Sequence, residues 1–357
     1  MTIIAEAGTG HNGDIKQAHE LIDAAAQAGA HYIKFQYVIA REILHPLTKP
    51  LVLFDKKVDL FQRFIDLEQT KEFYADLIQY ARKKNIGFLC SAFGLESAAN
   101  LLDLGVDSIK IASPELNHVP LMDFLNHNRI SVFASNGLAK LGDIEKALAL
   151  LTNCSVVLFH CVTSYPAEEK DYALACLPHL QAIFSVDIGC SDHTKNPLFI
   201  PLLAQYYGAQ YLEKHITLTR QGPGLDDELA ITPQELADLC KETQSFDQLL
   251  HLEGANKAYK HLIQRFSEDR VMLASGSGQY TLSQSEETAY HTSRRSIIAL
   301  ENIAAGESCT KKNCAVLRAE QGGVPGLHPK YFTLIQNKST KRDVPAGRGV
   351  QWGDLLL

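Results

Sequence analysis

The chain lacks the features that mark secreted, membrane-spanning and nucleic-acid-binding proteins. Residues 1–8 form an apolar strand pattern with Glu6 inside it, not the basic and then hydrophobic regions of a signal peptide. No uninterrupted apolar run approaches the roughly 18 residues that a membrane-spanning helix needs. The formal net charge is −7, and lysines and arginines are scattered among the acids, so there is no basic stripe for nucleic acid. We expect a protein that binds neither membranes nor nucleic acid.

Closely paired cysteines are also missing. None of the 8 cysteines forms a CxxC pair, the spacing typical of zinc and dithiol redox sites. Most of them lie in apolar segments, where reduced cysteines pack as small hydrophobic side chains. This usage predicts a reducing, cytoplasmic environment.

The composition is that of a large globular protein. The 357 residues are 46% hydrophobic and 21% charged, which excludes disorder of the whole chain. This length suits one barrel-sized domain followed by a small appendage.

Short β-branched runs alternate with longer helical patterns from Thr2 to about Leu250, which is the pattern of parallel βαβ units. The expected strands are residues 3–7, 32–36, 87–91, 108–112, 130–135, 155–160, 183–187 and 211–216. Eight strands are enough to close a (β/α)8 TIM barrel over residues 1–252. Periodicity alone leaves a doubly wound sheet as the alternative.

Helix boundaries support this alternation. Asp14 is placed to cap a helix with an apolar face, and Gly29 is placed to end it. Thr232 and Pro233 suit the N-cap and first position of another helix.

The C-terminal quarter differs from the preceding residues in composition and periodicity. Residues 253–290 are polar, contain Gly276-Ser277-Gly278 and have no sustained period, so we expect a linker carrying one helix. Residues 291–357 form a compact segment of short strands and turns. A segment this small is near the lower limit for independent folding, so we expect it to dock on another part of the protein.

Lysines and serines occur where several expected strands end, which in a parallel barrel is the end that carries the reactive groups. Lys34 and Lys110 supply positive charge there, and the hydroxyl donors are those of Ser113, Ser135 and Ser191. Together they predict a pocket for a phosphate or carboxylate. The alternative for each single lysine is an ion pair with a neighbouring acid.

Two histidines follow neighbouring strands. His193 and His215 stand at the ends of the seventh and eighth strands, about 4.8 Å apart in a sheet, and closure places Glu6 beside His215. Imidazole and oxygen ligands suit a divalent ion such as Mn²⁺ or Mg²⁺. The alternative is that each histidine is only hydrogen-bonded or solvated.

These motifs resemble the N-acetylneuraminate (sialic acid) synthases and their legionaminate and pseudaminate relatives, over nearly the whole chain. The matching stretches are Ala5-Glu6-Ala7-Gly8, His11-Asn12-Gly13, "AHYIKFQ" at 30–36, "IKIASPE" at 109–115, His160-Cys161, Tyr165-Pro166, "GCSDHT" at 189–194, "LEKHIT" at 212–217 and Gly222-Pro223-Gly224 with Asp226. The stretches "RRSIIALENIAAGE" and "KRDVPAGRGVQWGDLL" resemble the antifreeze-like (SAF) domain that follows the barrel in that family.

The resemblance implies a transferase that joins phosphoenolpyruvate to N-acetylmannosamine or a diacetamido analogue, giving a nine-carbon keto acid and phosphate. It implies a divalent metal on His193 and His215, most often Mn²⁺, with Mg²⁺ or Co²⁺ as alternatives. It assigns phosphoenolpyruvate to Lys34, Ser91, Lys110, Ser113, Ser135 and Ser191, and the sugar end to Glu6, Tyr165 and Asp226. We expect Glu6, Lys34 and Lys110 to act in catalysis.

The resemblance also implies a domain-swapped homodimer, in which Arg318 contacts the sugar's acyl group in a partner subunit's site. A linker of nearly 40 residues extends beyond roughly 100 Å, so geometry leaves action in its own barrel open. Two positions depart from the family pattern. Thr163, a further substrate-binding candidate, stands where asparagine is common, and Ala319 stands where proline usually follows the arginine.

Two other functions compete with this one. A phosphoenolpyruvate-dependent aldol synthase acting on a sugar phosphate would use the same anion pocket, but the histidine pair and the appended domain favour the unphosphorylated acceptor. A non-catalytic carbohydrate-binding or ice-binding protein would have no use for the set of strand-end lysines, serines and histidines.

Overall fold

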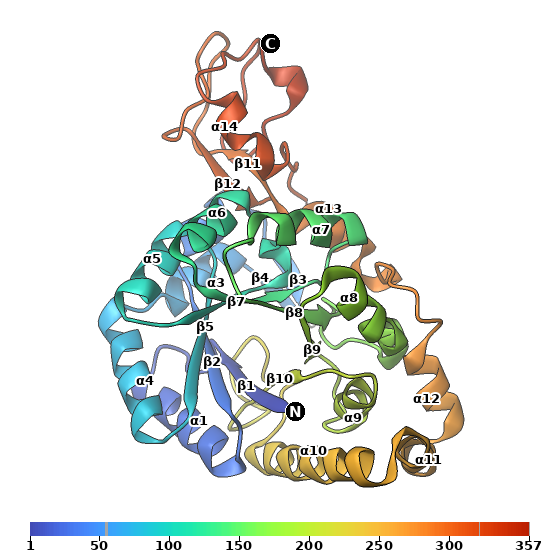
Figure 1. Ribbon diagram of the computed structural model, residues 1–357. Coiled ribbons are helices and arrows are strands. Elements are labelled where there is room, and N and C mark those ends of the chain that lie inside the picture. The colour runs from blue at the N-terminus through green and yellow to red at the C-terminus, as the bar shows by residue number, and fades with distance from the viewer. Residues whose placement is uncertain (54–55, 321, 357) are drawn as a thin grey trace.

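The computed structural model describes residues 1–53, 56–320 and 322–356. Eight parallel strands close into a barrel in the order β1-β10-β9-β8-β7-β6-β5-β2 (Figure 1). They are β1 (Thr2–Gly8), β2 (Tyr32–Tyr37), β5 (Gly87–Ala92), β6 (Ser108–Ile111), β7 (Ser131–Ser135), β8 (Val156–Cys161), β9 (Asp187–Asp192) and β10 (Tyr211–His215). The closed ring confirms the predicted barrel and excludes the doubly wound sheet.

Helices surround the barrel (Figure 1). They are α1 (Ile15–Ala28), α4 (Lys71–Lys83), α5 (Leu95–Asp103), α6 (Val119–Asn128), α7 (Leu141–Leu150), α8 (Leu177–Phe184), α9 (Phe199–Tyr206) and α10 (Pro233–Glu253). The Asp14 carboxylate accepts a hydrogen bond from the Lys16 backbone N–H at 2.8 Å, and Gly29 ends α1 with φ +87°. Thr232 caps α10 as expected. These caps confirm the helix boundaries that the sequence predicts at these positions.

The predicted seventh strand is wrong. Residues 183–187 were expected to form it, but Ile183 lies in α8 with its side chain 61% exposed, and β9 begins only at Asp187. Position 189 of this strand is a glycine because a Cβ there would lie 2.7 Å from the Phe159 ring. A large neighbouring side chain thus occupies the space that a β-branched residue would need. The other seven predicted strands agree with the observed ones to within one residue at each end.

Side chains inside the barrel form an apolar lower layer and a polar upper layer. Rings from Tyr32, Phe133, Phe159 and Tyr211 meet in the lower layer, with Phe133 and Tyr211 centroids 5.7 Å apart. Because strand side chains alternate between faces, the inward positions two residues further along reach the carboxyl end of the barrel. The polar layer therefore rests on a packed base of aromatic rings.

A long segment after β2 crosses the carboxyl end of the barrel. It contains α2 (Ala40–Ile43), β3 (Leu51–Leu53), β4 (Lys56–Val58) and α3 (Leu60–Leu67). Its residues Val38, Ile43, Leu44 and Leu60 form a small apolar cluster at the barrel mouth together with Phe93 from the loop after β5. The sequence pattern did not predict these elements.

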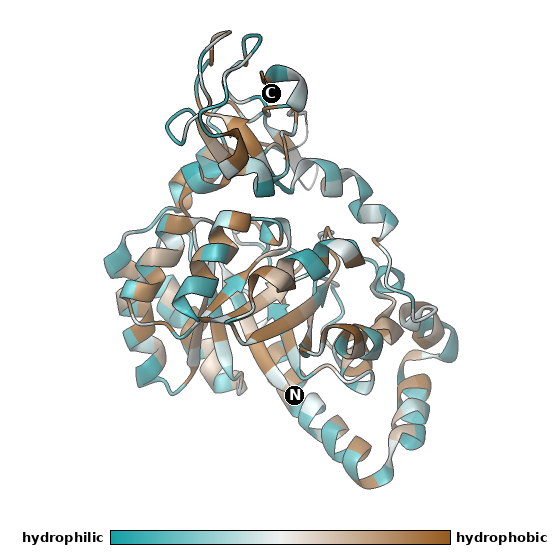
Figure 2. Ribbon diagram, turned by 45° about the horizontal axis from the view of Figure 1, so that its top comes forward, coloured by the Kyte–Doolittle hydropathy of each residue, from teal (hydrophilic) through white to brown (hydrophobic). Residues whose placement is uncertain are grey.

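The expected linker is more regular than predicted. Residues 255–292, here called the connector, contain α11 (Ala255–Phe266), α12 (Glu268–Ser275), the short 3₁₀ helix η4 (Gln284–Glu286) and α13 (Glu287–Thr292) (Figure 2). Ala258 and Leu262 are buried on one side of α11, and Phe266 packs against Phe199 of α9 with ring centroids 5.0 Å apart. The expectation of one helix is wrong, since Ala258, Tyr259, Leu262, Ile263 and Phe266 recur at helical spacing and form an apolar face of α11 that packs against the barrel.

The C-terminal domain has a core of its own and docks above the barrel (Figure 1). Its antiparallel strands β11 (Arg295–Ala299) and β12 (Cys314–Arg318) are followed by η5 (Pro329–Tyr331), α14 (Phe332–Ile335) and η6 (Trp352–Asp354). Its core comprises Ile297, Ala299, Ile303, Cys309, Cys314, Leu327, Ile335, Val344, Val350 and Leu355. Over the described ranges, no helix has the length and apolar character needed to cross a membrane.

Candidate active site

A cavity of about 400 Å³ opens at the carboxyl end of the barrel, beneath the C-terminal domain. All thirteen site residues expected from the sequence line it: Glu6, Lys34, Ser91, Lys110, Ser113, Ser135, Thr163, Tyr165, Ser191, His193, His215, Asp226 and Arg318. Side chains from Glu6 to Arg318, at opposite ends of the sequence, therefore share one space. Their placement is settled by the fold, whereas their roles remain predictions.

Four charged side chains form the floor of the cavity. This cavity cluster consists of Glu6, Lys34, Lys110 and Glu213, all buried. Lys34 Nζ lies 3.2 Å from a carboxylate oxygen of Glu6 and 3.2 Å from one of Glu213, and donates to Ser91 Oγ at 3.4 Å. Burial lowers the pKa of Lys34, but the two carboxylates outweigh it and the net shift is upward. Lys34 is thus a stable cation. It forms ion pairs with neighbouring acids, which was the alternative to anion binding for each single lysine.

Lys110 is held differently. Its ammonium donates to Ser135 Oγ and lies 3.8 Å from Glu213. Burial is the largest influence and lowers the pKa of Lys110. The attraction of Glu213 opposes this shift, while repulsion from Lys34 adds to it. The two lysines therefore crowd positive charge into one space, which an anion would stabilise.

Glu213 was missed as a site residue. Burial raises its pKa, but Lys110, Lys34 and His215 outweigh burial and bring the pKa down to about 2. The carboxylate is therefore ionised and is the shared counterion of both lysines. Alternation along β10 could have identified it, since Glu213 stands two residues before His215 and faces the same side.

Two oxygens in the cavity cluster lack hydrogen-bond donors. Within the described part of the chain, Glu6 Oε2 and Glu213 Oε2 are buried and accept no hydrogen bond. Each of these oxygens lies 3.2 Å from Lys34 Nζ, so its charge is compensated by an ion pair. One ion-pair contact leaves the other acceptor positions of each buried oxygen open, and a ligand or water could complete them.

The two histidines are neighbours, as predicted. Their ring centroids lie 5.5 Å apart, and the Tyr165 ring stacks on His193 at 4.3 Å. His193 Nδ1–H donates to the Val162 carbonyl at 2.8 Å, which leaves Nε2 unprotonated, 3.4 Å from Ser191 Oγ. Burial lowers the pKa of His193 and of His215, so both rings are neutral. Neutral imidazole with a backbone partner on its second nitrogen is the form that binds metals.

Fewer carboxylate oxygens lie beside His193 and His215 than the sequence predicted. Asp226 Oδ2 lies 3.6 Å from His215 Nδ1. Glu6 instead pairs with Lys34, and its Oε1 accepts a hydrogen bond from Gln36 Nε2 at 2.8 Å. Among the described residues, no three His, Cys, Asp or Glu side chains are grouped as a ready-made metal site. The chain therefore offers two imidazoles and a nearby carboxylate, a partial ligand set that leaves positions for water or substrate.

Arg318 reaches the mouth of its own barrel. It is part of a rim cluster made of Glu115, Arg295 and Arg318, in which Arg318 Nε donates to Glu115 Oε1 at 2.9 Å. Arg295 Nε donates to the other oxygen of Glu115, and Arg295 also donates to the Phe93 carbonyl at 2.6 Å and the Val316 carbonyl at 3.1 Å. The rim cluster joins the C-terminal domain to the loops after β5 and β6. A single chain thus accommodates Arg318 in its own site, and exchange between subunits stays a prediction.

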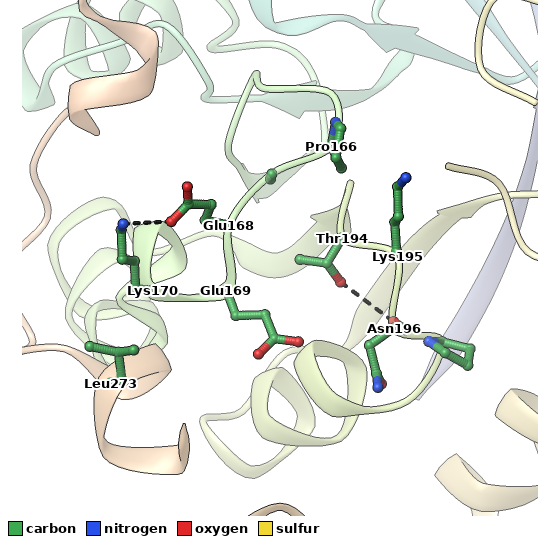
Figure 3. A pocket seen from close by; sticks show the side chains of 10 residues that line it. Pro166, Glu168, Glu169, Lys170, Thr194, Lys195, Asn196 and Leu273 are labelled. Atoms are coloured by element: carbon green, nitrogen blue, oxygen red, sulfur yellow. Dashed lines mark hydrogen bonds and ion pairs between the residues drawn. The ribbon is translucent and has the colours of Figure 1, made fainter. Parts of the chain in front are cut away.

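A second cavity, of about 730 Å³, lies on the outside of the barrel (Figure 3). It is lined by the loops after β8 and β9 and by Leu273 of α12. Its charged side chains pair with neighbours: Lys170 with Glu168 at 2.5 Å, and Glu169 with Arg270. No residue with an unsatisfied buried group in the described chain lines it, so the smaller cavity is the candidate active site.

Comparison with known proteins agrees with this fold and cavity. Residues 21–254 match the NeuB family, and residues 294–356 match the SAF domain. The spore coat polysaccharide biosynthesis protein SpsE of Bacillus subtilis is 34% identical, over 99% of this chain and 93% of the relative. An N,N'-diacetyllegionaminic acid synthase of Campylobacter jejuni is 32% identical, over 96% of this chain and 97% of the relative.

Solved structures give the same result. The crystal structure of Bacillus subtilis SpsE superposes with a TM-score of 0.80 at 32% identity, covering 100% of this chain and 95% of that one. An N-acetylneuraminic acid synthetase of Leptospira borgpetersenii, solved with citrate, has a TM-score of 0.62 at 32% identity, over 80% of this chain and 89% of that one. The chain therefore belongs to the NeuB family and carries a SAF domain at its C-terminal end.

Proposed function

We propose that this protein condenses phosphoenolpyruvate with an unphosphorylated N-acylated amino sugar to give a nine-carbon keto acid and phosphate. The observation that carries the proposal is the buried lysine pair, Lys34 and Lys110, in a cavity that also holds two neutral histidines. Relatives over most of the chain are named as legionaminic and pseudaminic acid synthases. One carbon–carbon bond forms between the enol carbon and the sugar carbonyl, water adds at C2, and the C–O bond to phosphate breaks.

The lysine side of the cavity suits phosphoenolpyruvate. Lys34, Lys110 and the hydroxyls of Ser91, Ser113, Ser135 and Ser191 form a cationic, donor-rich surface. Such groups stabilise a phosphate, a carboxylate and the extra negative charge that develops as phosphate leaves. Glu6, which forms an ion pair with Lys34, would accept a proton or a hydrogen bond from the attacking water.

The histidine side suits a divalent ion. His193 through Nε2 and His215 would hold Mn²⁺, or Mg²⁺ or Co²⁺ in its place, with Asp226 nearby. The fit rests on two neutral rings in adjacent positions and on the Val162 carbonyl that fixes the His193 tautomer. When bound there, such an ion supplies Lewis-acid polarisation of the sugar carbonyl.

The remaining wall of the cavity argues against a phosphorylated acceptor. The segment after β2 supplies an apolar surface made of Val38, Ile43, Leu51, Leu60 and Phe64. Of the cations that line the cavity in the described chain, Lys34 pairs with Glu6 and Glu213, and Arg318 pairs with Glu115. A second phosphate would therefore find no cation of its own, whereas acyl and methyl groups would pack well on the apolar wall.

A domain-swapped homodimer is the assembly that we propose with this function. Its support is the family resemblance, together with the position of Arg318 at a cavity mouth that either subunit's C-terminal domain could complete. Mixing a Lys110→Met chain with an Arg318→Ala chain tests it. Exchange between subunits predicts that the mixed dimers regain one intact site, and activity equal to the sum of the two variants would contradict it.

Release of phosphate tests the function directly. Purified protein is incubated with phosphoenolpyruvate, Mn²⁺ and one acceptor: N-acetylmannosamine, its 6-phosphate, or either of two diacetamido trideoxyhexoses. Products are then weighed by mass spectrometry. We expect phosphate release only when both an unphosphorylated N-acyl sugar and a divalent ion are present. Turnover restricted to the 6-phosphate would instead establish the sugar-phosphate synthase.

A further inference from the structure

The connector carries a buried carboxylate that reaches the wall of the active-site cavity. Glu286, the last residue of η4, is 3% exposed. Its Oε1 accepts hydrogen bonds from the backbone N–H groups of Leu138 at 2.9 Å and Thr163 at 2.8 Å, and its Oε2 accepts from Ser283 Oγ at 2.8 Å. The two backbone donors belong to the loops after β7 and β8. One carboxylate therefore bridges two consecutive loops of the barrel.

The loop after β7 needs such a tether. Leu138 lines the cavity and has φ +54°, a left-handed conformation that costs a non-glycine residue on the order of 1 kcal/mol. A second connector residue, Tyr280, donates from its hydroxyl to the carbonyls of Asn136 at 2.9 Å and Ala139 at 3.0 Å. The connector thus holds both sides of the strained residue.

Thr163 is the cavity-lining residue whose backbone Glu286 holds. Its hydroxyl is buried and, within the described chain, has no hydrogen-bond partner. A Cβ on Gly137 would lie 2.1 Å from Thr163 Oγ1 and 2.7 Å from Ser113 Oγ, so both hydroxyls converge above the Gly137 backbone at the cavity wall. Small shifts of the Thr163 backbone would therefore move an unpaired hydroxyl that lines the cavity.

We propose that Glu286 is a positioning residue that fixes the Thr163 hydroxyl for substrate binding and ties this position to the C-terminal domain. Glu286 lies immediately before α13, which leads into β11 of that domain. Displacement of the domain would therefore pull on both loops through one side chain. The identity of the substrate rests on the proposed function, whereas the tether itself does not.

Substitutions of Glu286 and Thr163 distinguish a role of Glu286 in positioning Thr163 from a role in stabilising the fold. Glu286→Ala leaves two buried backbone N–H groups without an acceptor, and we expect KM for the substrate that Thr163 contacts to rise about tenfold with kcat changed less than about threefold. Glu286→Gln keeps an oxygen that can accept both N–H groups, so it should stay within about twofold of the wild type. Thr163→Val should raise KM for the same substrate. The double variant Glu286→Ala, Thr163→Val should show no further increase, because one acts through the other.

Glu169→Ala is the matched control. It removes another carboxylate that joins barrel and connector, the partner of Arg270 beside the outer cavity (Figure 3), and touches no residue of the active-site cavity. KM should not change. A similar rise in KM in Glu169→Ala and Glu286→Ala, or additive effects of Glu286→Ala and Thr163→Val, would overturn the proposal.

Backbone hydrogen exchange tests the tether without turnover. In Glu286→Ala the amides of residues 138 and 163 should exchange faster, while Glu286→Gln and Glu169→Ala keep the wild-type protection. Unchanged exchange in Glu286→Ala would contradict the proposal. If the wild type converts none of the acceptors, the proposed function fails, and the exchange experiment still decides the role of Glu286.

Discussion

The two buried charge clusters at the carboxyl end of the barrel differ in how completely they are paired. In the rim cluster, Arg295 and Arg318 occupy both oxygens of Glu115, and four backbone carbonyls accept from Arg295. In the cavity cluster, Glu6 Oε2 and Glu213 Oε2 accept no hydrogen bond in the described chain. A satisfied cluster holds structure together, whereas an incomplete one is prepared for a ligand.

The pKa shifts of the charged groups also differ between the two clusters. In the rim cluster burial raises the pKa of Glu115, but the two arginines outweigh it and the net shift is downward. In the cavity cluster the two lysines respond in opposite directions, since the pKa of Lys34 rises and that of Lys110 falls. At the rim the two arginines keep Glu115 ionised, whereas in the cavity burial and repulsion from Lys34 disfavour the charge on Lys110, where phosphoenolpyruvate is proposed to bind.

The largest expected effect is on the rim cluster. Glu115→Ala should lower the free energy of unfolding by about 3–5 kcal/mol, because it leaves Arg295 as a buried charge without its counterion. Urea denaturation measures this loss. The control is Glu96→Ala, which removes the exposed partner of Arg41 and should cost less than about 1 kcal/mol. Equal losses in both variants would contradict the assignment of the rim cluster as a structural clamp.

Removing a charge from the cavity cluster should lower activity and leave stability almost unchanged. Lys110→Met keeps a side chain of similar length against Phe159 but removes the cation, so we expect kcat to fall about 10²- to 10³-fold. The melting temperature should stay within a few degrees of the wild type, because Glu213 retains its pair with Lys34. A variant that is fully active, or one that is unfolded, would remove the distinction between the clusters.

The histidine pair provides the next test. His215→Ala should abolish tight Mn²⁺ binding, measured by calorimetry, together with turnover, while circular dichroism stays that of a folded barrel. Chelator treatment of the wild type should have the same effect on activity and should be reversed by adding Mn²⁺. Undiminished activity in His215→Ala would exclude this residue from the site.

The smallest effect concerns acid. Burial lowers the pKa of His118, beside Arg295 and Glu115, to about 3. Its unfolded form takes up a proton below pH 6.5 while the folded form does not, so stability is lost as pH falls from about 6.5 towards 3. At pH 5.5 this amounts to about 1.4 kcal/mol. His118→Gln should lose less stability over this interval, and an identical pH dependence in both proteins would refute the effect.

Much of the fold follows from local sequence patterns. Alternating faces place Lys34 and Lys110 inside the barrel, and the rule that strand ends carry the chemistry brings together the thirteen predicted residues. The seventh strand failed because Gly189 has no β propensity and is required by the Phe159 ring. Local pattern cannot report a contact between residues thirty positions apart.

Long-range partners account for the other omissions. Glu115 lies in a motif that the sequence identified, but its arginine partners are 180 and 203 residues away. Glu286 lies in a polar stretch without any period, and only its bonds to Leu138 and Thr163 give it a role. The connector helices were missed because the stretch is polar as a whole, although residues 258, 259, 262, 263 and 266 of α11 have helical spacing and pack towards α9 and α10.

A crystal structure with phosphoenolpyruvate and Mn²⁺ is the most direct test of the account. We predict that the phosphate and carboxylate of the ligand lie within hydrogen-bond distance of Lys34, Lys110 and the cavity serines, and that an anomalous peak for manganese touches both His193 and His215. Phosphoenolpyruvate bound at the outer cavity instead, with no peak between the two imidazoles, would contradict the assignment of the barrel mouth as the active site.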